Sequence, residues 1–233
     1  MASNTFKGFV YGAVAAASYG LNPLFTLPLY ADGVSADSVL FYRYGLGVVM
    51  LALLMKVQKQ SFALHRSEVL PLLVMGMLFA FSSLTLFQSY NYMDAGIAST
   101  ILFVYPVLVA VIMAVFFKEK VSVITAVSIA LAFVGISLLY KGEGGKTLSL
   151  IGVLLVFISS LTYAIYIIGV NRSSLKDMPT AKLTFYALLF GLSVFVVRLK
   201  FCTHLDPYQY SLAVDQSDRV SFIPDCNIFS RHD

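Results

Sequence analysis

Long apolar runs constrain this sequence more than any other feature. A hydrocarbon core about 30 Å thick needs roughly 20 residues of helix, because no water is present there to satisfy the backbone polar groups. Seven stretches meet this requirement, and they cover residues 6–30, 38–57, 69–92, 95–117, 121–140, 148–170 and 181–197. We therefore expect an all-α fold: a polytopic membrane helix bundle with about seven transmembrane helices.

Composition and charge exclude most other classes. Charged residues make up 12% of the chain, against about 25% in soluble domains. The formal net charge is +4, but Lys and Arg stand singly or in pairs between apolar runs, so no surface for nucleic acid is expected. Metal-ligand spacings, nucleotide-binding loops and catalytic triads are lacking. We expect neither an enzyme nor a catalytic, cofactor or metal site.

The distribution of Lys and Arg predicts the orientation. Positive residues gather in cytoplasmic loops. The amino end and the loops on its side carry nine of them, whereas the loops on the opposite side carry four, namely Lys141, Lys146, Arg198 and Lys200. The amino terminus is therefore predicted to be cytoplasmic.

A shift of 144 residues aligns the chain with itself. It pairs Gly8 with Gly152, Tyr19 with Tyr163, and residue 47 with Gly191. Five spans separate a segment from its copy, and because this number is odd the copy enters the membrane from the other side. Inverted repeats of this kind are typical of secondary transporters. We expect a complete first five-helix repeat in residues 1–147 and an incomplete second repeat, of two helices, in 148–198.

Residues 199–233 have a different composition. Five Asp and both Cys lie after residue 200, so this segment is too polar to supply the next span of the second repeat. We interpret it as a non-membrane tail that is unrelated to the repeat or disordered, as a shifted reading frame would give. A genuine extracytoplasmic tail is the alternative.

The stretch from Ser89 to Ser122 resembles the fourth helix of EamA-type transporters in the drug/metabolite transporter superfamily. Small residues precede a mid-helix Pro106, and Glu119 closes the helix on the cytoplasmic side. Phe41-x-Arg43 at the second span adds to this resemblance. It extends over residues 6 to about 198 and implies ten helices around a central cavity in a bacterial inner membrane. This sequence would then supply seven of them, with Pro106 and Glu119 in structural or gating roles.

Arg43 is the single charge set inside a span. Insertion of Arg at the bilayer centre costs about 2.5–3.5 kcal/mol, so a functional role is one interpretation. It would then face the cavity and attract an anionic group such as a carboxylate. The alternative is that its long side chain reaches the nearby interface.

Other polar and aromatic residues share helix faces. Tyr19 and Asn22 lie on one face of the first span, and Tyr163 and Tyr166 lie on the repeat-related face of the sixth. Gln88 and Tyr92 lie on one stripe of the third span. Ordinary hydrogen bonds between helices are the alternative role. With Arg43, the candidate substrate-binding residues are Tyr19, Asn22, Gln88, Tyr92, Tyr163 and Tyr166.

These observations predict export or facilitated diffusion of small metabolites by alternating access, and the resemblance suggests amino acids. The expected partners are the lipid bilayer and a small solute. The spacing Gly8-x-x-x-Gly12 permits close approach of two helices and is compatible with a homodimer. The alternatives are a seven-helix receptor or sensor, and a non-transporting membrane subunit that pairs with another chain.

Overall fold

The computed structural model describes residues 22–31, 33–119, 127, 131, 134 and 149–200. The chain divides into two compact units, Met1–Gly33 and Val34–Asp233. In the described part of the first unit, one helix, α2 (Asn22–Ala31), contains Pro28. The second unit holds α3 (Ala36–Val57), α4 (Arg66–Ser89), α5 (Ala95–Leu102), α6 (Tyr105–Phe117), α8 (Leu150–Arg172) and α9 (Thr180–Arg198). Every regular element in the described residues is a helix, which confirms the all-α prediction.

Five segments of the second unit are long and apolar enough to cross a membrane. They are α3, α4, the combined α5 and α6 (Ala95–Phe117), α8 and α9. These correspond to five of the seven predicted spans and confirm a polytopic helix bundle. The predicted spans 6–30 and 121–140 lie mostly outside the described residues, as does the tail from residue 201.

The ends of α3 and α4 follow from local capping. The Ser35 side chain accepts a hydrogen bond from the backbone N–H of Ser38, 3.3 Å away, at the start of α3. At the start of α4, Glu68 Oε2 accepts from the backbone N–H of His65 at 2.9 Å. Both helices therefore begin where a side chain satisfies backbone groups that the helix itself leaves unpaired.

The third predicted span ends earlier than the apolar pattern suggests. Helix α4 stops at Ser89, whereas the prediction ran to Tyr92. The Asp94 carboxylate caps the next helix by accepting from the backbone N–H groups of Gly96 and Ile97 at 2.8 and 3.2 Å. The chain must turn before this cap, so Tyr92 lies in the turn and not on the α4 face.

Pro106 breaks the fourth predicted span into α5 and α6. It lies in the first turn of α6, where its missing N–H costs nothing. Leu102, four residues earlier, therefore cannot receive the usual helical hydrogen bond from residue 106. Its carbonyl instead accepts from Ser160 Oγ on α8 at 3.2 Å. The break in one helix thus becomes a contact with another.

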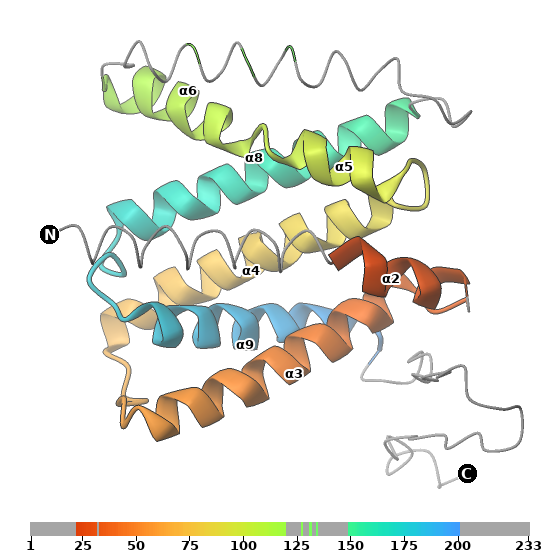
Figure 1. Cartoon of the computed structure of the whole chain (residues 1–233). Helices are drawn as coiled ribbons and strands as arrows, with labels where there is room; N and C mark the ends of the chain where they lie inside the picture. The colour runs from red at the N-terminus through yellow and green to blue at the C-terminus, as the bar shows by residue number, and fades with distance from the viewer. Residues whose placement is uncertain are drawn as a thin grey trace, which may run out of the picture. The chain divides into compact units, whose positions relative to one another are not determined.

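Helix α4 occupies the centre of the second unit. It packs against both α8 and α9, while α3 packs along α9, and α5 and α6 pack along α8 (Figure 1). Met93 contacts Gly152, and Met75 contacts Gly169, so α4 and α8 run antiparallel. Large apolar side chains on the outer faces of α3 and α6 are exposed, including Met50 and Phe116, as expected of a surface in contact with lipid.

Candidate functional site

An aromatic cluster crosses the interior of the bundle. It joins Tyr44 of α3, Phe79 of α4, Tyr105 of α6, and Tyr163 and Tyr166 of α8, and we call these five residues the midplane cluster. Ring centroids of neighbouring members lie 4.8 to 6.2 Å apart, within the range of favourable aromatic contacts. Four separate helices thus contribute rings to one cluster.

The midplane cluster lies close to the middle of the membrane spans. Tyr44, Phe79, Tyr105 and Tyr163 are each within three residues of the centre of their own span. At 1.5 Å per residue this offset is at most about 4.5 Å. Binding sites of secondary transporters lie near the same depth.

The tyrosine hydroxyls of the cluster differ in their bonding. The Tyr44 hydroxyl donates to the Phe79 carbonyl at 3.3 Å and lies 2.8 Å from Ser83 Oγ. Within the described ranges, the hydroxyls of Tyr105, Tyr163 and Tyr166 have no hydrogen-bond partner. All three side chains are half-buried. They offer three polar groups that a small solute can use.

Serine contacts fix α4 against α8 beside the cluster. Ser82 Oγ donates to the Ser159 carbonyl at 3.0 Å, and Ser159 Oγ donates to the Ser82 carbonyl at 2.7 Å. Both residues are buried. Ser159 shares a helix face with Tyr163 and Tyr166, so that face provides a helix contact at one position and the midplane cluster at the next two.

Close glycine contacts fix α4 against α9. A methyl group at Gly76 would lie 2.8 Å from the Ala187 carbonyl oxygen, and one at Gly191 would lie 3.2 Å from the Gly76 carbonyl oxygen. Ala187 contributes a backbone atom, which cannot move aside as a flexible side chain can. The absence of a side chain at Gly76 therefore sets the spacing of the two helices.

A second group of residues lies nearer the end of the bundle at which α4 stops. The Arg43 guanidinium carbon lies 5.4 Å from the ring centroid of Phe87, a cation–π contact. Tyr90 follows α4, and its hydroxyl is 3.4 Å from Ser99 Oγ. Burial raises the pKa of the Tyr90 phenol, and the hydrogen bond with Ser99 and the charge of Arg43 partly offset this rise. Tyr90 therefore stays neutral at physiological pH.

Arg43 itself is exposed. Within the described segments it forms no ion pair with a carboxylate, although it lies well inside α3. Two other arginines at span ends, Arg172 and Arg198, each have a carboxylate partner. Of these three arginines, Arg43 is thus the one whose charge no described carboxylate neutralises.

The remaining predicted residues are spread over the chain. Gln88 is half-buried, and it lies nine residues, or about 13 Å along α4, from Phe79. Tyr92 is 48% exposed in the turn after α4. Tyr19 lies outside the described residues, and only the backbone of Asn22 is described. The predicted pair Tyr163 and Tyr166 is the part that the structure brings together.

The comparison with protein-family models found a match that covers the first part of the chain. The model of the EamA-like transporter family matches residues 6–141, which are 136 of the 233 residues and so more than half of the chain. The chain belongs to the EamA-like transporter family. It is thus a multi-pass integral membrane protein of a family that transports small solutes and does not consist of enzymes. Comparisons with curated proteins and with solved structures found no match.

The two EamA motif residues singled out in the sequence have structural contacts. Pro106 interrupts the helix and leaves the Leu102 carbonyl of α5 free to accept a hydrogen bond from Ser160 of α8. Glu119 pairs with Arg172 of α8, whose guanidinium carbon also lies 4.6 Å from the Phe117 ring centroid. Among the described residues, His, Cys, Asp and Glu form no group of three or more that could hold a metal ion.

Sequence reasoning missed three members of the midplane cluster, Tyr44, Phe79 and Tyr105. A usable signal was present, because each lies near the centre of its span and aromatic residues at that depth are far from the interfacial belts they often occupy. It also missed the ion pair between Asp37 and Arg198, because these residues are far apart in the sequence.

Proposed function

We propose that this EamA-family chain moves a small amphiphilic metabolite, such as an amino acid, across the membrane by alternating access, and that the solute binds at the midplane cluster. The observation that carries this proposal is the set of three half-buried tyrosine hydroxyls without partners among the described residues, close to the middle of the spans. Membership of a transporter family supports the general function.

The chemistry of the cluster suits an amphiphilic solute. Aromatic faces contact an apolar body, and a tyrosine hydroxyl can both donate and accept hydrogen bonds, so it can meet either a carboxylate or an ammonium group. The five cluster residues carry no formal charge at neutral pH. Arg43, nearer the membrane surface, would supply the attraction for an anionic group before the solute reaches the middle.

A discontinuous span at the same depth supports this location. The chain between α5 and α6 leaves the helix at residues 103–104, next to Tyr105. Transporters with inverted repeats commonly form their binding sites where membrane helices are interrupted. Tyr105 begins α6 directly after this interruption.

The contact of α3 with α9 supports the inverted repeat. A methyl group at Gly47 would lie 2.9 Å from Cδ1 of Leu188, and one at Gly191 would lie 2.7 Å from Cε1 of Tyr44. The shift of 144 residues exchanges these two contacts, since it pairs Tyr44 with Leu188 and Gly47 with Gly191. A pair of segments related by a two-fold axis has contacts of this reciprocal form.

We place the protein in a bacterial inner membrane, as the family resemblance implies, and the charge at the two ends of the bundle supports a cytoplasmic amino terminus. The loops that follow α3 and α8 lie at the end where α4 begins. In the described part of the chain this end carries seven Lys and Arg: Lys56, Lys59, Arg66, Lys118, Arg172, Lys176 and Lys182. The other end carries Arg198 and Lys200. The positive-inside rule assigns the richer end to the cytoplasm.

Transport in vesicles tests the proposal. The full chain is reconstituted and the uptake of a labelled amino-acid mixture is compared for the wild type, Tyr163→Phe and Tyr163→Ala. Loss of one hydroxyl contact worth about 0.5–1.5 kcal/mol lowers the rate at low solute roughly 2- to 10-fold, and Tyr163→Ala lowers it further. Phe157→Ala is the control, because Phe157 is on the same helix but exposed.

Two results would contradict the proposal. Equal uptake by Tyr163→Ala and the wild type would show that the solute does not bind at the midplane cluster. Saturable binding of amino acids with no flux in any direction would favour a receptor over a transporter.

A further inference from the structure

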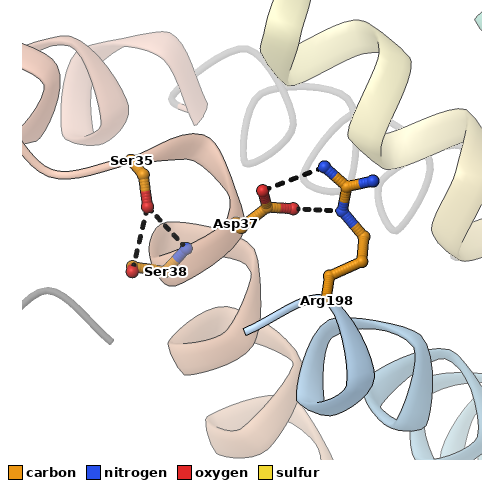
Figure 2. A network of polar contacts seen from close by, with 4 residues as sticks. All are labelled: Ser35, Asp37, Ser38 and Arg198. Atoms are coloured by element: carbon orange, nitrogen blue, oxygen red, sulfur yellow. Dashed lines mark hydrogen bonds and ion pairs between the residues drawn. The ribbon is translucent and has the colours of Figure 1, made fainter. Parts of the chain in front are cut away.

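An ion pair joins α3 to α9 at one end of the bundle. Arg198 Nε donates to Asp37 Oδ1 at 2.7 Å, and Arg198 Nη2 donates to Asp37 Oδ2 at 3.1 Å (Figure 2). Two parallel hydrogen bonds between a guanidinium and a carboxylate fix the relative orientation of the groups. The contact links the first turn of α3 to the last turn of α9.

Hydrogen bonds between two serines cap the start of α3, where Asp37 lies. Ser35 Oγ lies 3.0 Å from Ser38 Oγ and 3.3 Å from the backbone nitrogen of Ser38 (Figure 2). Asp37 lies between these two serines, in the first turn, where a negative charge is also favourable for the helix dipole. The first turn of α3, from which Asp37 reaches Arg198, is therefore capped and carries a favourable charge.

A second ion pair joins α6 to α8. Glu119 follows the end of α6, and Arg172 is the last residue of α8. The Arg172 guanidinium also lies over the ring of Phe117 on α6. Arg172 thus makes two contacts with the α6 end of the chain, one with a charge and one with an aromatic face.

The two ion pairs lie at opposite ends of the bundle. Asp37 is at the start of α3, so it lies at the end where the antiparallel α4 stops. Arg172 is at the end of α8, which runs antiparallel to α4, so it lies where α4 begins. Helix α4 has 24 residues and spans about 36 Å. By the positive-inside rule, the Glu119–Arg172 pair is on the cytoplasmic side and the Asp37–Arg198 pair on the other.

Different kinds of contact hold the helices together at the ends and in the middle of the bundle. Each ion pair connects a helix of the first predicted repeat with a helix of the second, and its side chains are between 23% and 52% exposed. At this exposure water can solvate the separated charges, so each pair can open and re-form. The Ser82–Ser159 contact and the Gly76 contact with α9 are buried and uncharged, and they lie between the two ends. This arrangement has a fixed middle with a breakable contact at each end.

We propose that Asp37–Arg198 and Glu119–Arg172 are opposing latches, and this inference rests on the alternating access proposed above. The Asp37–Arg198 pair opens to admit solute from the extracytoplasmic side, and the Glu119–Arg172 pair opens to admit it from the cytoplasm. Each open state keeps the latch at the opposite end closed. Removing one latch shifts the population towards the state that is open at that end.

Side-specific labelling of a cysteine in the midplane cluster tests the latches. Tyr166→Cys is introduced with Cys202→Ser and Cys226→Ser, and an impermeant thiol reagent is applied to each side of sealed vesicles. We expect Asp37→Asn to raise extracytoplasmic labelling several-fold and to lower cytoplasmic labelling. Glu119→Gln has the opposite effect. Asp177→Asn, which removes an exposed acid in the loop between α8 and α9, leaves the ratio of the two labelling rates unchanged.

Charge exchange separates a latch from general damage to the fold. Asp37→Arg with Arg198→Asp restores the wild-type ratio, and so does Glu119→Arg with Arg172→Glu. The proposal is overturned if both single variants change labelling equally from the two sides, if neither changes it, or if the exchanges fail to restore the ratio.

The labelling ratio does not depend on flux. If the two variants shift the labelling ratio in opposite directions but the protein shows no measurable transport, the latch proposal stands and the transport proposal is rejected. Normal transport with an unshifted ratio would reject the latches alone.

Discussion

The helices are held together by uncharged contacts in the middle of the bundle and by ion pairs at its two ends. In the middle, uncharged residues such as Ser82, Ser159 and Gly76 hold the helices together. At the ends, Asp37–Arg198 and Glu119–Arg172 do so. Charges are costly in the hydrocarbon core but not at its surface, where water can solvate them when a pair separates. In the latch proposal, the contacts in the middle are kept while those at the two ends open in turn.

The largest expected effect comes from enlarging the contact in the middle. Gly76→Leu forces a side chain against the backbone of α9, where a methyl group alone would already lie 2.8 Å from a carbonyl oxygen. Overpacking of this kind costs about 1–3 kcal/mol or more, so we expect a clear fall in the yield of folded protein and in its thermal midpoint. The measurement is the monodisperse yield in detergent and the thermal midpoint.

Gly45→Leu is the matched control for that substitution, because nothing lies within 4 Å of a methyl group at Gly45. If Gly76→Leu is as stable as Gly45→Leu, the close packing of α4 on α9 is not what holds the middle together.

A smaller effect is expected at Arg43, the charge that does not follow the pattern of the ends. Arg43→Gln removes the attraction for an anionic group, so uptake of a carboxylate-bearing solute falls roughly tenfold, which corresponds to about 1.4 kcal/mol. Arg43→Lys retains part of the rate. The neutral amide analogue of the same solute serves as the control, and an equal fall for both solutes would assign Arg43 to structure and not to solute attraction.

The serine contact is expected to contribute less. Ser82→Ala with Ser159→Ala removes hydrogen bonds between α4 and α8 that average about 0.6 kcal/mol each in membrane proteins, so the double variant loses roughly 1 kcal/mol of unfolding free energy. Each single variant keeps the hydrogen bond donated by the other serine and loses about half as much. Ser193→Ala is the control, because the Ser193 hydroxyl bonds to its own helix. Unfolding by a denaturing detergent measures the difference, and a double variant as stable as this control would contradict the role of the pair.

The smallest effect is expected from Tyr90 at alkaline pH. Because burial raises its pKa in the folded state, the folded protein keeps this proton while the unfolded chain loses it above about pH 10. The folded state then binds more protons, so stability falls as pH rises through that range. Tyr90→Phe should therefore lose less of its thermal midpoint between pH 9 and 11 than the wild type does. An identical or steeper loss would show that the Tyr90 proton does not matter.

The sequence predicted the spans well because each depends on a local property. A run of about 20 apolar residues is needed wherever a helix crosses lipid, and five such runs became α3, α4, α5 with α6, α8 and α9. The end of α4 was predicted less well, since Asp94 imposes a turn inside an apolar stretch. Pro106 was recognised as a proline within a helix. The hydrogen bond that the Leu102 carbonyl accepts from Ser160 could not be predicted, because it depends on how α5 meets α8.

The site was predicted in part for the same reason. Tyr163 and Tyr166 lie on one helix face, which a period of 3.6 residues reveals. Their contacts with Phe79 and Tyr105 join separate helices, and nothing in a single sequence specifies which helices become neighbours. The pairing of Asp37 with Arg198 across 161 residues is of the same kind.

Protection of the midplane cluster by solute is the sharpest test of a central binding site that opens to each side of the membrane in turn. Tyr163→Cys, in a chain with Cys202→Ser and Cys226→Ser, is labelled from either side of sealed vesicles with and without a saturating amino-acid mixture. We expect the reagent to reach residue 163 from both sides and the solute to slow labelling from both. Labelling that no solute slows, or that proceeds from one side under every condition, would contradict a central site that opens to each side in turn.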